Sequence, residues 1–124
     1  MSIERLDHVN IRTSNLAALI EFYEQCIGLK KGSRPGFEST GAWLYIGDRD
    51  IVHLNGSLSA KPSKEPQLEH FALRGTDYEA FIDNLEKHGV DYTSNDIEDI
   101  NLRQIHVYDP DGNHVELNFL STNG

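Results

Sequence analysis

The sequence has few of the features that mark disulfide-rich or membrane proteins. Cys26 is the only cysteine, which excludes an intramolecular disulfide and a cysteine-based zinc site. No apolar stretch approaches the roughly 20 residues needed to cross a bilayer. The N-terminal residues also lack the basic and then apolar pattern of a signal peptide. We therefore expect a cytoplasmic location, with Cys26 as a buried thiol on a helix.

Basic residues are also few, and they are scattered. Lys and Arg number 11 against 20 Asp and Glu, which gives a formal net charge of −9. Nucleic-acid binding needs clustered Lys and Arg to contact phosphates, so we expect no nucleic-acid partner. A chain of 124 residues, 38% of them hydrophobic, is typical of one globular domain or of two small units that share a core.

An internal repeat divides the chain in two. Residues 6–12 (LDHVNIR) and 68–74 (LEHFALR) share Leu, an acidic residue, His and Arg at matching positions. A segment with helical spacing of apolar residues follows each, at about 15–27 and 77–88, and repeats of this kind indicate a duplicated structural unit.

The expected helix boundaries correspond in the two halves. Ser14 and Thr76 are the predicted N-caps, because a side-chain oxygen there can accept a free first-turn N–H. Gly28 and Gly89 are placed where a left-handed residue ends a helix at least cost. Further strands are predicted at about residues 30–34, 42–46, 51–55, 91–95, 102–108 and 114–120.

Each half is therefore strand, helix and three strands. This order predicts an α+β fold of two βαβββ modules in tandem, residues 1–57 and 66–122, joined by a polar loop. We expect a single domain over residues 1–124, with a curved mixed sheet and the helices outside.

Strand alternation places polar side chains on one face of the expected sheet. His8 on the first strand corresponds to His70, and His53 at the end of the first half corresponds to Glu116. If the two modules pair about a pseudo-twofold axis, these four side chains can converge. Three imidazoles and one carboxylate suit Zn, Ni, Fe, Co or Mn better than Ca or Mg, so the pattern predicts one divalent metal ion.

These stretches, with residues 107–117 (VYDPDGNHVEL), resemble the vicinal oxygen chelate superfamily, which includes glyoxalase I, bleomycin resistance proteins and extradiol dioxygenases. The resemblance implies metal ligation by His8, His70 and Glu116. The fourth ligand of glyoxalase I, a carboxylate that also acts as base, falls on His53. This departure leaves His53 as a ligand or as an acid/base, and weakens an assignment to glyoxalase I itself.

The resemblance also implies the chemistry and the residues around it. Arg12 falls where glyoxalase I has an arginine for the glutathione carboxylate, which favours a thiol-adduct or carboxylate substrate. The first hypothesis is a metal-dependent lyase or isomerase, with His53 and Glu116 as catalytic residues and an enediolate-like oxyanion. The candidate substrate-binding residues are Arg12, His106, Tyr108 and Trp43, and Phe37 is a further pocket candidate.

Two alternatives stay open at this point. Two His and one carboxylate also form the facial triad of Fe(II) oxygenases, so an extradiol ring-cleavage dioxygenase with His53 and His106 as acid/base residues is the second hypothesis. A non-catalytic small-molecule binding or resistance protein is the third. A homodimer is expected, with each site within one chain or shared between two. His88 and His114 are predicted to be exposed.

Overall fold

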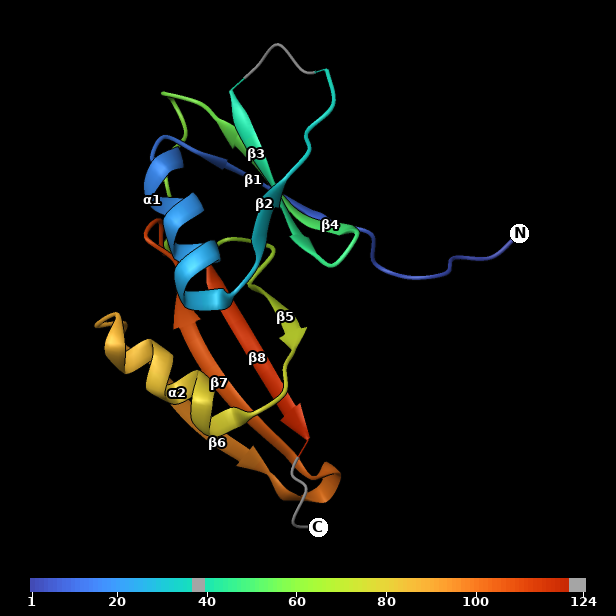
Figure 1. The fold of residues 1–124 in the computed structure, drawn as a ribbon, viewed down its shortest axis with the longest axis vertical. Coiled ribbons are helices and arrows are strands. Elements are labelled where there is room, and N and C mark those ends of the chain that lie inside the picture. Colours follow the sequence, from blue (N-terminus) through green and yellow to red (C-terminus); the bar gives the residue numbers. More distant parts are fainter. Residues whose placement is uncertain (37–39, 121–124) are drawn as a thin grey trace. The chain divides into compact units, whose positions relative to one another are not determined.

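The computed structural model describes residues 1–36 and 40–120 (Figure 1). It divides into two compact units, Met1–Lys61 and Pro62–Gly124. Phe37 and residues 121–122 of the second predicted module lie outside the described residues.

The first unit has the expected order of elements. Its strands are arranged in the order β1-β4-β3-β2, with β1 parallel to β4 and the other pairs antiparallel. The elements are β1 (Val9–Thr13), α1 (Leu16–Glu21), its π-helical continuation η1 (Phe22–Ile27), β2 (Lys30–Gly32), β3 (Gly41–Ile46) and β4 (Arg49–Gly56).

The second unit repeats this topology. Its strands follow the order β5-β8-β7-β6, again with the first and last strands parallel. The elements are β5 (His70–Arg74), α2 (Tyr78–Lys87), β6 (Thr93–Ile97), the 3₁₀ turn η2 (Glu98–Ile100), β7 (Leu102–Tyr108) and β8 (His114–Leu120). Each unit is thus a βαβββ module with its own four-stranded mixed sheet, which confirms the α+β prediction.

The N-cap predictions at Ser14 and Thr76 are wrong by one residue. The second helix is capped by Asp77, whose carboxylate accepts a hydrogen bond from the N–H of Ala80 at 3.2 Å. Asn15 occupies the N-cap of α1 but makes no side-chain cap bond. Both helices therefore begin one residue later than predicted, and only at Asp77 does a side chain accept a first-turn hydrogen bond.

The C-terminal predictions hold. Gly28 (φ 92°) and Gly89 (φ 67°) both adopt the left-handed conformation just after a helix, where a residue without Cβ avoids a steric clash. Cys26 is buried on η1, as predicted, and burial raises the pKa of its thiol.

One face of each sheet is apolar and packs against the helix of its own unit. In the first unit α1 lies against β3 and β4. In the second, the rings of Tyr78 and Phe81 on α2 lie edge-on to Phe119 of β8 at 5.6 and 5.7 Å. The buried apolar strand residues are Ala42, Leu44, Val52, Leu54, Ile105, Val107, Val115, Leu117 and Phe119. The opposite face of each sheet is left for polar residues.

The helices of the described residues are all too short or too polar to cross a membrane.

Leu85 tests whether α2 is held by this packing. Its side chain is fully buried, so Leu85→Ala should lower the free energy of unfolding by about 2–5 kcal/mol, measured by urea denaturation. Leu58→Ala is the matched control, because Leu58 is 99% exposed and its truncation should change stability by no more than about 0.5 kcal/mol. Equal denaturation midpoints for the two variants would contradict the packing of α2.

Candidate metal and catalytic site

The parallel pairing of first and last strands organises the polar face of each unit. Asn10 of β1 lies opposite His53 of β4, and Ala72 of β5 lies opposite Glu116 of β8. The residue two places before Asn10 or Ala72 points to the same face, because strand side chains alternate. In the first unit, His8 therefore lies beside His53 of the last strand. In the second unit, His70 lies beside Glu116 of the last strand.

Three aromatic rings stack in the first unit. The ring of His53 is parallel to that of His8, with centroids 3.8 Å apart and an interplanar angle of 14°. It is also parallel to Trp43, at 4.1 Å and 6°. Because His8 and Trp43 each lie within about 4 Å of the same ring, they must cover opposite faces of His53. This stacking leaves His53 only 9% exposed although it lies on the polar face.

An acidic residue precedes each first-strand histidine and bonds to it. The Nδ1 atom of His8 lies 2.8 Å from Oδ2 of Asp7, and Nδ1 of His70 lies 2.6 Å from Oε1 of Glu69. An ionised carboxylate can only accept a hydrogen bond, so Nδ1 carries the proton in both rings. The Nε2 lone pair of each ring is then available to a metal ion.

His70 and Glu116 come together in the second unit. The Nε2 atom of His70 lies 3.5 Å from Oε1 of Glu116. Two donor atoms bound to one ion at about 2.1 Å with tetrahedral angles are about 3.4 Å apart, so this separation suits a shared cation. The Oε1 atom also lies 4.0 Å from Nδ1 of His106.

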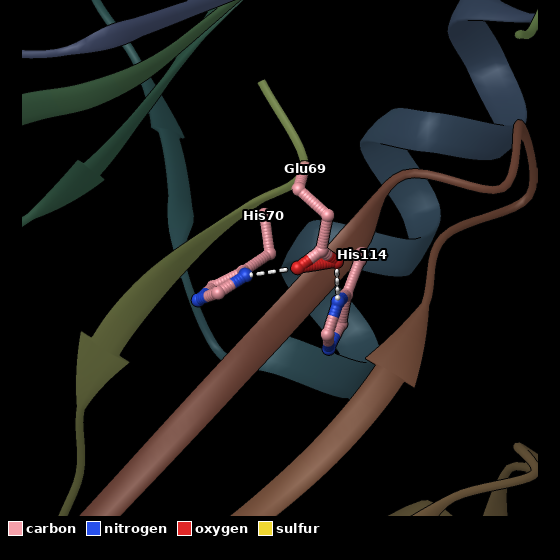
Figure 2. A group of neighbouring side chains, drawn as sticks. All are labelled: Glu69, His70 and His114. Carbon is pink, nitrogen blue, oxygen red and sulfur yellow. Dashed lines mark hydrogen bonds and ion pairs between the residues drawn. The ribbon is translucent and has the colours of Figure 1, made fainter. Parts of the chain in front are cut away.

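His114 joins the same face from the first residue of β8. Figure 2 shows Glu69 between the two imidazoles, with one oxygen bonded to His70 and the other 2.9 Å from Nδ1 of His114. Ligand atoms of these three residues lie within 4.8 Å of one another, so the cluster could hold a metal ion. The prediction that His114 is exposed is wrong: its side chain is only 13% exposed.

Amide side chains fix the carboxylate of Glu116 from the other side. Asn118 donates to Oε2 of Glu116 at 2.9 Å, and Gln104 donates to Asn118 at 3.0 Å. The Nδ2 group of Asn95 donates to Gln104. The Oδ1 atom of Asn95 lies 2.7 Å from Nε2 of His106 and accepts from it. Since Oε2 is engaged, Oε1 is the oxygen that faces His70.

The remaining predicted site residues lie at different points of these faces. Arg12 is exposed on β1, opposite Asn55. Tyr108 is 60% exposed, and its ring stacks on His114 at 5.0 Å. Within the first unit His8, His53 and Trp43 are in contact, and within the second His70, His106 and Glu116 are neighbours. Glu69 was not among the predicted site residues, although the repeated acidic residue before each histidine was a signal for it.

A family model supports the interpretation of these features. The model of the Glyoxalase/Bleomycin resistance protein/Dioxygenase superfamily matches residues 5–117. The chain belongs to this superfamily. No curated protein sequence matched the chain.

Solved structures of proteins with low sequence identity share the fold of this chain. A putative glyoxalase family protein from Bacillus anthracis has a TM-score of 0.81 and 22% identity, over 98% of both chains. A glyoxalase/dioxygenase from Nostoc punctiforme has a TM-score of 0.73 and 16% identity, over 93% of this chain and 90% of that one. The fosfomycin resistance protein FosX from Listeria monocytogenes has a TM-score of 0.73 and 15% identity, over 98% of both chains.

The Glu69–His70 contact predicts a pH response of this superfamily member. The hydrogen bond to Glu69 raises the pKa of His70, and the bonds from His114 and His70 lower the pKa of Glu69. The contribution of His70 to stability is therefore present below the ordinary imidazole pKa and is lost as the pH rises through the raised value. That of Glu69 is present above the ordinary carboxyl pKa and is lost as the pH falls through the lowered value.

Glu69→Gln should lower the pKa of His70 toward the ordinary imidazole value, because the hydrogen bond that raises it is lost. The measurement is an NMR titration of the His70 ring protons in metal-free protein. Glu65→Gln is the control, since Glu65 is an exposed acidic residue four positions away and its neutralisation should leave the titration unchanged. An unchanged His70 titration in Glu69→Gln would contradict the contact.

Proposed function

We propose that this chain is a divalent-metal-dependent enzyme of glyoxalase type, a lyase or isomerase that acts on a small substrate with adjacent oxygens. The observation that carries the proposal is the 3.5 Å separation of the His70 Nε2 and Glu116 Oε1 atoms on neighbouring strands. Both donors are held by further hydrogen bonds, to Glu69 and Asn118. Oriented donors of this kind are typical of metal sites.

His8, His70 and Glu116 are the proposed metal ligands, and membership of the superfamily supports this set. The two imidazoles present the same nitrogen, since Asp7 and Glu69 each hold Nδ1. The mixed N and O donors suit Zn, Ni, Fe, Co or Mn.

The chemistry divides between the ion and the protein. When bound, a divalent ion polarises the substrate oxygens as a Lewis acid. His53 is the proposed acid/base: a neutral imidazole takes the proton from the carbon beside the polarised carbonyl and returns it to the neighbouring carbon. Glu116, as a proposed ligand, contributes a negative charge to the metal site. Stacking on His8 and Trp43 holds the His53 ring in place and excludes water from its faces.

Substrate contacts follow from the polar faces. Arg12 is proposed to bind a substrate carboxylate, which fits a thiol adduct, because a guanidinium matches carboxylate geometry. Trp43, His106 and Tyr108 are proposed to contact the rest of the molecule. We also propose that the chain acts on a small molecule, forms a homodimer and has no nucleic-acid or membrane partner.

The position of His106 favours a second candidate, an Fe(II) extradiol dioxygenase. The Nδ1 atom of His106 lies 4.0 Å from Oε1 of Glu116, and this proximity supports His106 as a proposed acid/base beside a proposed ligand. His53 and His106 would then be the two acid/base residues for a catechol substrate. The solved neighbours include a protein named as a glyoxalase/dioxygenase, and its fold is compatible with this chemistry.

Metal content tests the ligand set. Protein purified without chelator or affinity-tag metal should contain about one divalent ion per site, and His8→Ala, His70→Ala and Glu116→Ala should each lose it, because three ligands cannot be reduced to two without a large loss of affinity. The measurement is elemental analysis by mass spectrometry. His88→Ala is the control, since His88 is an exposed histidine at the end of α2. Wild-type protein that takes up no metal on reconstitution would leave a non-catalytic binding protein.

The role of His53 is tested by substitution with Gln. His53→Gln should retain the ion and lose activity by about 10²–10⁴-fold, the usual contribution of a general acid/base. Activity is followed with three probes that carry adjacent oxygens: the hemithioacetal of methylglyoxal and glutathione, a catechol with dioxygen, and fosfomycin, which the name of FosX suggests. Loss of the ion in His53→Gln would instead make His53 a ligand.

A further inference from the structure

The ladder between β3 and β4 contains one extra residue, next to His53. Trp43 lies opposite His53 and Leu44 opposite Val52, but Tyr45 lies opposite Asp50, so that Ile51 is left over. An extra residue of this kind is a β-bulge, which turns the side chains beyond it. Trp43 and Tyr45 share a face, and Asp50 is therefore brought to the face of His53.

The corresponding ladder of the second unit has no such shift. Tyr108 of β7 lies directly opposite His114, and His106 lies opposite Glu116. Tyr45 and Tyr108 occupy matching places in the two units, so Asp50 takes the place that His114 takes in the second unit. In a regular ladder Ile51 would hold that place. The bulge therefore exchanges an apolar side chain for a carboxylate beside His53.

The carboxylate and the imidazole are in contact. Oδ2 of Asp50 lies 2.6 Å from Nε2 of His53, and the two side chains are 31% and 11% exposed. This hydrogen bond lowers the pKa of Asp50, so the carboxylate is ionised near neutral pH and can only accept. His53 therefore carries its proton on Nε2, and its lone pair is on Nδ1. His8 and His70 have the opposite arrangement, with Nδ1 bonded to an acid.

We propose that Asp50 is the positioning residue of His53, which it holds through Nε2–H so that Nδ1 is the atom that exchanges a proton with the substrate. This role rests on the proposed function. The proton taken from the substrate carbon resides on Nδ1 and is returned from it, while the Nε2–H bond to Asp50 persists. A carboxylate in this position stabilises the imidazolium that forms and selects one tautomer of the neutral ring. The opposite nitrogen choice separates His53 from the two histidines proposed as ligands.

The tautomer can be measured without metal or substrate. Long-range ¹H–¹⁵N correlation of the imidazoles in metal-free protein, at a pH well above the ordinary imidazole pKa of about 6.5, should show wild-type His53 protonated at Nε2. In Asp50→Asn the amide can either accept or donate, so the Nδ1-protonated form should appear. Asp48→Asn is the matched control, because Asp48 is an exposed Asp in the same hairpin and should leave the spectrum unchanged.

A wild-type His53 protonated at Nδ1, or identical spectra for wild type and Asp50→Asn, would overturn the proposal. Metal content gives an independent readout. Asp50→Asn should retain the ion of the wild type, since a positioning residue of the acid/base does not ligate, and loss of the ion would also overturn it. If wild-type protein binds no metal, the proposed function fails, yet the tautomer measurement still decides whether Asp50 orients His53.

Discussion

The parallel pairing of the first and last strands of each unit is the constraint on which the rest of the structure depends. Two parallel strands cannot be joined by a short turn, and here the helix and two further strands make the connection. The pairing brings residues from the two ends of a unit side by side. His70 is thereby placed next to Glu116, and His8, which directly precedes β1, next to His53. The apolar face of each sheet packs on its helix, and the face left over collects the histidines and carboxylates.

Carboxylates then hold similar imidazoles through different ring nitrogens. A histidine has two ring nitrogens, and a hydrogen bond to one of them determines which atom is available for chemistry. His8 and His70 are bonded through Nδ1 to the acidic residue that precedes each of them. His53 is bonded through Nε2 to Asp50. The first arrangement suits the proposed metal ligands, and the second suits the proposed proton carrier. The duplicated module therefore contains histidines with two different hydrogen-bonding arrangements.

Much of the fold could be predicted from the sequence, because hydrophobic alternation and the internal repeat are local signals. The predicted ranges of β7 and β8 match the structure, and Gly28 and Gly89 end their helices as expected. Boundaries set by backbone geometry were predicted less well. The helix caps fell one residue later than predicted, and His114 is part of the polar cluster rather than exposed, because it contacts Glu69, which directly precedes β5, and His106 of β7.

The sequence by itself determined the duplicated βαβββ order and the alternation that puts His53 and Glu116 on polar faces, since both depend only on residue spacing. The tertiary structure alone decided which carboxylate meets which imidazole. Glu69 reaches His114 across 45 positions of the chain, and a contact of that kind depends on strand register. Asp50 meets His53 only because one extra residue shifts the ladder. A period-two pattern contains no information about such a shift, since a bulge changes the face of every residue beyond it.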